Sequence, residues 1–192
     1  MRVQLYGEGE GSVEYVSHTP SSTRPNSNII TFKFTVPIFV RSQHHCDRTW
    51  SYNEIDSMGT LPKFYNPETL RKNDDTSGEP FDPLIDPDNR AGGNAATYLV
   101  MVHNNACSRL YDKLIKNGVC EEYARSVLPQ NTYVQYYGTT NLKNLVNFAD
   151  RTLRDLSQRE LQLVARACLK LSESFFPEEI RSYINSMSVQ DG

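Results

Sequence analysis

Hydrophobic and polar residues alternate along the first half of the chain in a way that predicts strands. The clearest case is residues 30–36, where every second residue is apolar and Thr or Lys stands between. This period of two is typical of a half-buried strand. The strand is expected to continue into the apolar residues 37–40, and weaker patterns predict strands at 2–6 and 12–16. Residues 7–11 and 17–28 are rich in turn-forming residues and are expected to form a break and a loop.

The second half of the chain has the period of amphipathic helices. Residues 95–117 predict the longest helix, because Gly118 then offers a left-handed C-cap. Aromatic and β-branched residues at 132–139 predict another strand. Further helices are expected at 121–128, which Pro129 ends, at 141–153, after a capping box at 157–160, and from Pro177 onward. These elements predict an α+β fold in which an antiparallel sheet packs against a helical layer.

Two polar stretches interrupt this order. Residues 41–65 are expected to carry a short helix in their middle. Residues 66–94 contain four prolines and few apolar positions, and are expected to form a long flexible loop. A length of 192 residues suits one hydrophobic core, so we expect a single domain spanning residues 1–192.

Composition narrows the class of protein. Hydrophobic residues make up 38% and charged residues 22% of the chain, as in folded soluble proteins. No apolar run approaches the ~20 residues of a membrane span, and the first residues form no signal-peptide core, which disfavours a membrane or secreted protein. A net charge of −3 disfavours a nucleic-acid polymer as partner. The four scattered cysteines lack a C-x-x-C pair, so we expect reduced thiols and a cytoplasmic location.

The densest group of reactive side chains lies between Gln43 and Glu54. It contains two histidines, a cysteine and an aspartate in succession at 44–47. Adjacent residues do not converge easily on one metal ion, and no second His or Cys pair follows to complete four ligands, so a metal site is disfavoured. A Cys–His nucleophile pair stays open, although neighbours in sequence rarely align their side chains. The simplest interpretation is a set of polar residues around the start of a helix.

Two further groups occur in the second half of the chain. Arg125 lies in residues 118–129, where the simplest interpretation is an amphipathic helix with a surface ion pair. Asn141, Asn144 and Asn147 follow one another at three-residue intervals and share roughly one helix face. Amides donate and accept hydrogen bonds at once, so such a face suits a heterocycle or a ribose.

In their order and spacing the three groups resemble the flavin-dependent thymidylate synthases, which methylate C5 of dUMP with methylene-tetrahydrofolate, FAD and NADPH. The resemblance covers roughly residues 28–175, and three collinear motifs are more specific than any one of them. It rests on residues 37–40, Gln43, 48–49, Ser51, 53–54, 118–119, Glu122, 124–125, 127–129, Asn141, Leu145, 147–148, Gln158 and Glu160. The resemblance implies a homotetramer with an α+β fold.

The sequence departs from the family signature, which is Arg-His-Arg, seven residues and then Ser. Here Cys46 and Asp47 replace the first two signature residues, and only Arg48 is kept. Seven residues, 49–55, follow Arg48, and the position after them holds Asp56 in place of the signature Ser, with Ser57 one position later.

A second departure concerns the pyrimidine ring. The family places an arginine after the residue equivalent to Asn147, where it contacts the ring and favours ionised N3. An ungapped alignment puts Thr152 at this place, with Arg151 beside it. A shift by one residue turns a helical side chain by about 100°, so Arg151 is not an automatic substitute. Arg151 and Thr152 are therefore both candidates for the catalytic ring contact.

The resemblance also implies binding roles. A nucleotide phosphate carries nearly two negative charges, for which arginine offers bidentate donors. The residues implied to bind the pyrimidine nucleotide monophosphate are Gln43, Arg48, Glu54, Asp56, Ser57 and Arg125. Those implied to line FAD are Asp47, Arg48, Glu54, Asn141, Lys143 and Asn147.

The departures leave three functions open. The chain is a working thymidylate synthase in which Arg151 takes over the ring contact, or it methylates or hydroxymethylates another nucleotide such as dCMP, or it is a non-catalytic nucleotide-binding relative. Asp56 and Asp150 favour dCMP if either accepts a hydrogen bond from the cytosine amine, whereas a salt bridge is the competing explanation. A metal-dependent hydrolase using His44 and His45 is a fourth, quite different class.

Overall fold

The structure, a computed structural model, describes residues 1–6, 9–20, 27–56, 59–71, 81–85, 93–154 and 158–188, with side chains described up to residue 185. The chain divides into two compact units. One unit combines Met1–Ser57 with Tyr133–Gly192, and the other comprises Met58–Thr132. Whether the two units form one domain, as the length predicts, stays a prediction.

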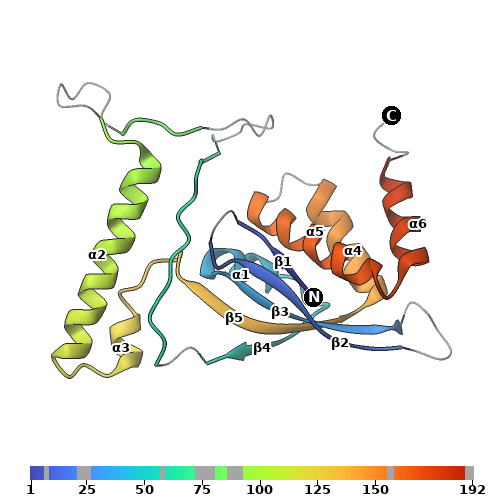
Figure 1. Cartoon of the computed structure of the whole chain (residues 1–192), viewed down its shortest axis with the longest axis horizontal. Coiled ribbons are helices and arrows are strands. Elements are labelled where there is room, and N and C mark those ends of the chain that lie inside the picture. The colour runs from blue at the N-terminus through green and yellow to red at the C-terminus, as the bar shows by residue number, and fades with distance from the viewer. Residues whose placement is uncertain are drawn as a thin grey trace. The chain divides into compact units, whose positions relative to one another are not determined.

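The first unit is built on a five-stranded antiparallel sheet (Figure 1). Its strands, in the order β1-β2-β3-β5-β4, are β1 (Arg2–Gln4), β2 (Ser12–Thr19), β3 (Ile29–Pro37), β5 (Tyr133–Asn141) and β4 (Ser51–Ile55). The central pair has Phe34 opposite Tyr136 and Phe32 opposite Gly138. The predicted α+β class and antiparallel sheet are confirmed.

Helices cover one face of this sheet (Figure 1). They are α1 (Ile38–His44), α4 (Leu142–Arg154), α5 (Arg159–Glu173) and α6 (Pro177–Ser188), and α1, α4 and α5 contact the strands directly. The apolar side chains of β3 at 30, 32, 34 and 36 are fully buried beneath them, as the period of two predicts. Each such side chain contributes about 1.5–3 kcal/mol on burial, which makes β3 the centre of the core.

An aromatic cluster joins α1 to the sheet. The ring of His44 is fully buried, with its centroid 5.0 Å from Phe34, 4.8 Å from Trp50 and 4.8 Å from Phe148. His44 Nδ1 lies 2.9 Å from the Tyr136 hydroxyl. Burial, reinforced by the neighbouring His45, lowers the pKa of His44 to about 3, so the ring is neutral at neutral pH. His44 is therefore a core residue, not a metal ligand at the surface.

Glycine at position 138 makes room for this cluster. A Cβ atom there would lie 2.7 Å from a ring carbon of Phe34 and 3.2 Å from one of Trp50. Because interiors are close-packed, neither ring could move away without disturbing its neighbours. The aromatic cluster thus depends on a glycine in β5.

The segment after β3 differs from the sequence-based expectation. The helix begins at Ile38, directly after Pro37, and not in the middle of residues 41–65. Pro37 has a φ of −61° and lacks an N–H, which suits the residue that precedes a helix. The sequence pattern also does not predict β4, because this edge strand pairs only with β5 and is mostly polar.

The second unit contains α2 (Ala96–Lys116) and α3 (Glu121–Arg125). Gly118 follows α2 with a φ of +81°, the left-handed conformation expected of its C-cap. Near the start of α2, Asp82 accepts hydrogen bonds from the backbone N–H and hydroxyl of Thr97 at 3.0 and 2.6 Å. α3 ends three residues earlier than predicted, where the Ser126 hydroxyl donates to the Tyr123 carbonyl at 2.7 Å and so competes with helical bonding.

Parts of four predicted features lie outside the described residues. They are positions 7–8 of the predicted break, 21–26 of the predicted loop at 17–28, 72–80 and 86–92 of the predicted loop at 66–94, and Ser157 of the predicted capping box. Within 66–94, Leu70 forms an isolated bridge with Phe81, and Leu84 with Ala95. Among the described helices none combines the length and the apolar character needed to cross a bilayer.

The buried His44 should make the stability of the protein depend on pH. The imidazole has an ordinary pKa of 6.5 when unfolded and a pKa of about 3 when folded. The unfolded chain therefore binds more protons between these values, and stability falls as the pH falls through this window. We expect this group to lower the free energy of unfolding by about 2 kcal/mol between pH 7 and pH 5.

Urea unfolding at the two pH values measures this effect. His44→Phe cannot be protonated, so its unfolding free energy should lose most of the pH dependence even though its overall stability is lower. A variant that kept the full difference would show that other groups cause it.

Candidate functional site

The carboxylate of Asp47 holds the loop that follows α1. Asp47 Oδ1 accepts hydrogen bonds from the backbone N–H and the hydroxyl of Thr49, at 3.0 and 2.7 Å. Asp47 Oδ2 accepts from a terminal nitrogen of Arg151 on α4 at 2.6 Å. The Asp47 side chain is 9% exposed, whereas that of Arg151 is 60% exposed. One nearly buried carboxylate thus ties the loop to the helix and leaves much of Arg151 at the surface.

This ion pair joins two departures from the family signature that are far apart in the sequence. Asp47 stands within the signature, and Arg151 stands one residue before the position of the ring-contacting arginine. Thr152, at that position in the ungapped alignment, is 5% exposed and faces the core. Of the two candidates for the ring contact, Arg151 is therefore the accessible one.

The three asparagines of the predicted amide face serve different purposes. Asn141 Oδ1 accepts the backbone N–H of Asn144 at 2.9 Å and so caps the start of α4. Asn144 Nδ2 donates to the carbonyl of Thr49 at 3.4 Å, and this carbonyl also accepts the Thr140 hydroxyl at 3.2 Å. Asn147 is exposed. Two of the amides thus stabilise the helix and the loop.

The outer side of α4 carries a row of polar side chains. Lys143, Asn147 and Arg151 follow one another at four-residue intervals, and all three are exposed. Residues four apart lie one above another on a helix, so these side chains form a single line. The line offers two cations and an amide to a ligand.

A second polar group lies between α1 and β4. Arg41 donates to Glu54 Oε1 at 2.7 Å, and His45 Nδ1 is 3.9 Å from the same oxygen. The His45 ring stacks on Tyr52 with a centroid distance of 4.0 Å. Burial lowers the pKa of His45, and Glu54 opposes this shift while Arg41 adds to it. Within the described residues, Arg41 Nε and His45 Nε2 are among the buried side-chain atoms without a hydrogen-bond partner, which leaves each of them able to bond to a ligand.

The other predicted residues of the first unit lie at its surface. Gln43, Arg48 and Asp56 are exposed, and Ser57 is outside the described residues. Cys46 is also exposed, but its thiol donates to the Ser42 carbonyl at 3.3 Å and not to a histidine. The described part of the chain holds no group of three or more His, Cys, Asp or Glu residues able to bind a metal ion.

Arg125 lies in the second unit, where Glu121 is its partner at 3.2 Å. Both oxygens of Glu121 accept the backbone N–H of Gly59, at 3.0 and 2.9 Å, and Oε1 also accepts the Tyr111 hydroxyl at 3.2 Å. These donors, with the Gly59 N–H contributing most, lower the pKa of Glu121 and keep it ionised at neutral pH. The ion pair that the sequence predicts for Arg125 is confirmed, but the prediction does not name its partner, although the four-residue spacing of Glu121 from Arg125 is a signal for it.

Comparison with known families and curated proteins gives consistent matches. The family described as thymidylate synthase complementing protein matches residues 11–178. The flavin-dependent thymidylate synthase of Thermosipho melanesiensis is 30% identical over 158 residues, which is 81% of this chain and 68% of the relative. That of Thermus thermophilus is 34% identical over 154 residues, which is 78% of this chain and 54% of the relative. The chain thus spans between about half and two thirds of the length of these relatives.

Solved structures match the fold. The UMP/dUMP methylase PolB from Streptomyces cacaoi, bound with 5-Br dUMP, superposes with a TM-score of 0.69 over 95% of this chain and 97% of its own. The same protein bound with 5-Br UMP gives a TM-score of 0.68. The sequence identities are 22% and 23%, so this likeness shows the fold alone.

Two arginines of α4 form ion pairs, with Asp47 and with Asp150, and we expect these pairs to contribute unequally to stability. Asp47→Ala removes an acceptor for three donors in a nearly buried place, and we expect it to lower the free energy of unfolding by about 2 kcal/mol. Asp150 pairs with Arg154 at 2.6 Å within the same helix, but both side chains are more than a third exposed. Asp150→Ala should therefore cost only about 0.5 kcal/mol. Urea unfolding of both variants measures the difference, and equal small losses would mean that Asp47 does not hold the loop.

Proposed function

The chain belongs to the family of flavin-dependent thymidylate synthases, and we propose that it transfers a one-carbon unit from methylene-tetrahydrofolate to C5 of dUMP, with FAD as cofactor and NADPH as reductant. The family match over residues 11–178 and the shared α+β fold support this proposal. The observation that carries it is the accessible Arg151, bound to the altered signature through Asp47.

We propose that Arg151 makes the contact with the pyrimidine ring. Its guanidinium has five N–H donors, and the bond to Asp47 uses one terminal nitrogen. The remaining donors suit the O4 and N3 acceptors of uracil, and the positive charge favours ionised N3. Thr152 has a buried side chain and is assigned to packing between α4 and the core.

The nucleotide phosphate needs cations with fixed geometry. We assign Arg48 and Arg125 to this role, because arginine offers paired donors to a dianion, and Gln43 to hydrogen bonding with the nucleotide. Asp56 and Ser57 follow the signature and stay proposed neighbours of the nucleotide.

The residues present fit a flavin. Lys143, Asn147 and the partly used amide of Asn141 offer a cation and amides to the cofactor, and the unpartnered nitrogens of Arg41 and His45 lie beside Glu54. When bound, the flavin would supply the hydride chemistry of the reaction. Asp47 has both oxygens occupied by Thr49 and Arg151, so we assign it to holding the loop and not to contacting the flavin.

The contacts of Asp150 favour dUMP over dCMP. Reading the cytosine amine needs an acceptor that is not already engaged, but Asp150 accepts from Arg154 at 2.6 Å. The salt-bridge explanation for Asp150 therefore holds in this structure. A contact between the cytosine amine and the exposed Asp56 stays a prediction.

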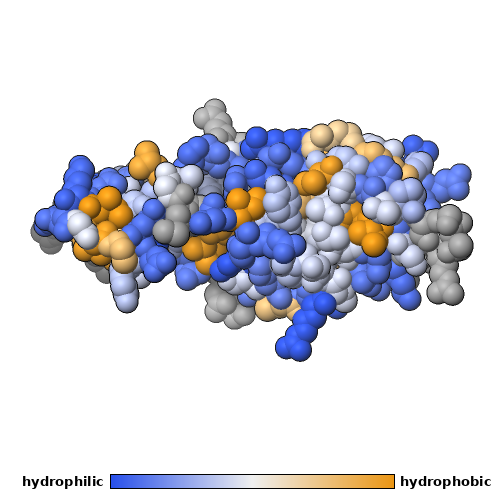
Figure 2. All heavy atoms as spheres, turned by 90° about the horizontal axis from the view of Figure 1, so that it is seen from below, coloured by the Kyte–Doolittle hydropathy of each residue, from blue (hydrophilic) through white to orange (hydrophobic). Residues whose placement is uncertain are grey.

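We also propose that the enzyme works as a homotetramer in the cytoplasm. In the single chain α2 exposes large apolar side chains, which are Tyr98, Met101, Val102, Leu110 and Ile115. Figure 2 shows apolar residues reaching the surface as separate patches among hydrophilic ones. Contacts between copies would cover such surface. All four cysteines are free, in keeping with a reducing compartment.

A flavin titration tests this function. The purified protein with FAD should show a bound-flavin spectrum that dUMP perturbs and dCMP does not, and light scattering should give about four times the 21.9 kDa chain mass. A perturbation by dCMP alone would move the substrate to cytosine. A protein that neither binds flavin nor responds to nucleotides would be a non-catalytic relative.

Substitution of Arg151 tests the ring contact. Arg151→Ala removes a charge-assisted contact made to the reacting base, and we expect kcat/KM for dUMP to fall about 100-fold. Thr152→Val keeps the buried shape and should change kcat/KM by less than about two-fold. Arg154→Ala, on the same helix, removes an exposed arginine as a control. Equal small effects of all three changes would exclude Arg151 from the site.

A further inference from the structure

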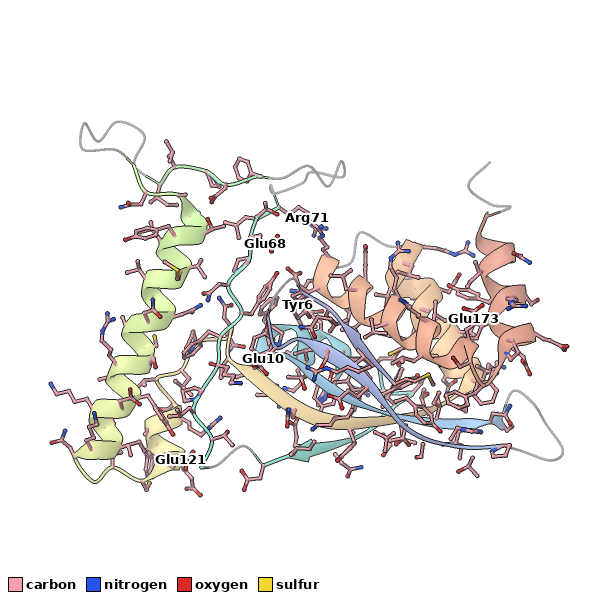
Figure 3. All side chains as sticks on the ribbon, viewed as in Figure 1. Tyr6, Glu10, Glu68, Arg71, Glu121 and Glu173 are labelled. Atoms are coloured by element: carbon pink, nitrogen blue, oxygen red, sulfur yellow. The ribbon has the colours of Figure 1, made fainter. Side chains whose placement is uncertain are left out.

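Glu121 joins three segments of the second unit through one carboxylate. It lies at the start of α3, beside the end of α2 (Figure 3). Its donors are the backbone at Gly59, the Tyr111 hydroxyl on α2 and the guanidinium of Arg125. The side chains of Glu121 and Arg125 are each 20% exposed, so burial alone does not require so many partners.

These contacts define the direction of the Arg125 side chain. An unrestrained arginine side chain samples many rotamers. It loses this conformational entropy when it binds a phosphate through two parallel hydrogen bonds. The bond from a terminal nitrogen of Arg125 to Glu121, at 3.2 Å, fixes one edge of the guanidinium. The orientation of the planar group is thus set before a ligand arrives.

The same carboxylate fixes the backbone just beyond the signature. Gly59 has a φ of +77°, a conformation that favours glycine, and its N–H points to Glu121. Gly59 lies two residues after Ser57 and three after Asp56, both of which are proposed neighbours of the nucleotide. Glu121 therefore orders backbone directly next to them in the chain.

The negative charge of Glu121 does not exclude an anion from Arg125. The carboxylate is also stabilised by the Gly59 N–H and by Tyr111, whose side chain is 6% exposed. Arg125 is therefore one of three hydrogen-bond donors to the ionised carboxylate. Its bond to Glu121 uses one terminal nitrogen of a guanidinium that carries five N–H donors.

We propose that Glu121 is a positioning residue for nucleotide binding, which orients Arg125 and the backbone at Gly59 toward the nucleotide phosphate without touching the nucleotide. This assignment rests on the proposed function, because it takes a pyrimidine nucleotide monophosphate as the ligand of Arg125. Glu121 lies within the 118–129 segment but is not one of the positions on which the family resemblance rests.

The test compares dUMP with deoxyuridine, which lacks the phosphate, on the flavin-loaded enzyme. Glu121→Gln keeps the shape of the side chain and removes the charge that holds Arg125. We expect the Kd and KM for dUMP to rise about ten-fold with kcat nearly unchanged, and the Kd of deoxyuridine to stay within about two-fold. Tyr111→Phe removes one donor to Glu121 and should raise the Kd for dUMP by only about two- to three-fold.

Glu173→Gln is the matched control. Glu173 pairs with Arg181 at 3.3 Å, nearly the separation of Glu121 and Arg125, and both glutamates are labelled in Figure 3. This pair joins α5 to α6 and includes none of the proposed ligand residues, so its loss should leave dUMP binding unchanged. Thermal unfolding of both variants checks that each remains folded.

A double-mutant cycle decides whether Glu121 acts through Arg125. In the Arg125→Ala background, Glu121→Gln should weaken dUMP binding by no more than about two-fold further. The positioning role is overturned if Glu121→Gln leaves dUMP binding unchanged, weakens deoxyuridine equally, or has its full effect without Arg125. A wild-type enzyme that binds flavin but not dUMP would instead refute the proposed function, and the role of Glu121 with it.

Discussion

The complete burial of one face of β3 is the constraint on which the first unit depends. Its four inward side chains are fully buried, and β3 pairs with β2 on one side and β5 on the other. β3 leads through Pro37 into α1, and the loop after α1 leads into β4, where Ser51 lies opposite Thr139 of β5. Thr139 is three residues before α4, so the register of the sheet brings the signature loop to the start of α4. The core thereby creates the place where Asp47 and Arg151 meet.

The Asp47–Arg151 pair shows how a chain can change its signature without leaving charges unpaired. A carboxylate at 47 is nearly buried, and a buried charge without a partner is costly. Arg151 on α4 donates to Oδ2 of Asp47, and Thr49 donates two hydrogen bonds to Oδ1. One ion pair thus connects two departures from the signature that lie 104 positions apart. The arginine remains accessible for the proposed ring contact.

The second unit uses the same principle in a different setting. Glu121 accepts a hydrogen bond from Arg125, as Asp47 accepts one from Arg151. In both cases a carboxylate that is also bonded to other donors restrains the guanidinium. In each case the acidic residue is bonded on more than one side before any ligand is present. Binding then costs less side-chain entropy, because the arginine is already ordered. The proposed cations of the site are thus held by residues that need not contact the substrate.

Elements whose signals are local can be placed from the amino-acid sequence. The alternation at 30–36, the C-cap at Gly118 and the start at Pro177 each depend on neighbouring residues, and the corresponding elements are where the patterns place them. The collinear motifs also identified the family. Three features depend instead on tertiary packing: the start of α1 at Ile38, the edge strand at 51–55, and the burial of Thr152 beside an accessible Arg151. The same holds for the bonds from Asp47 to Arg151 and from Glu121 to Gly59, which join residues 104 and 62 positions apart. Such contacts follow from sheet register and packing, which no local pattern contains.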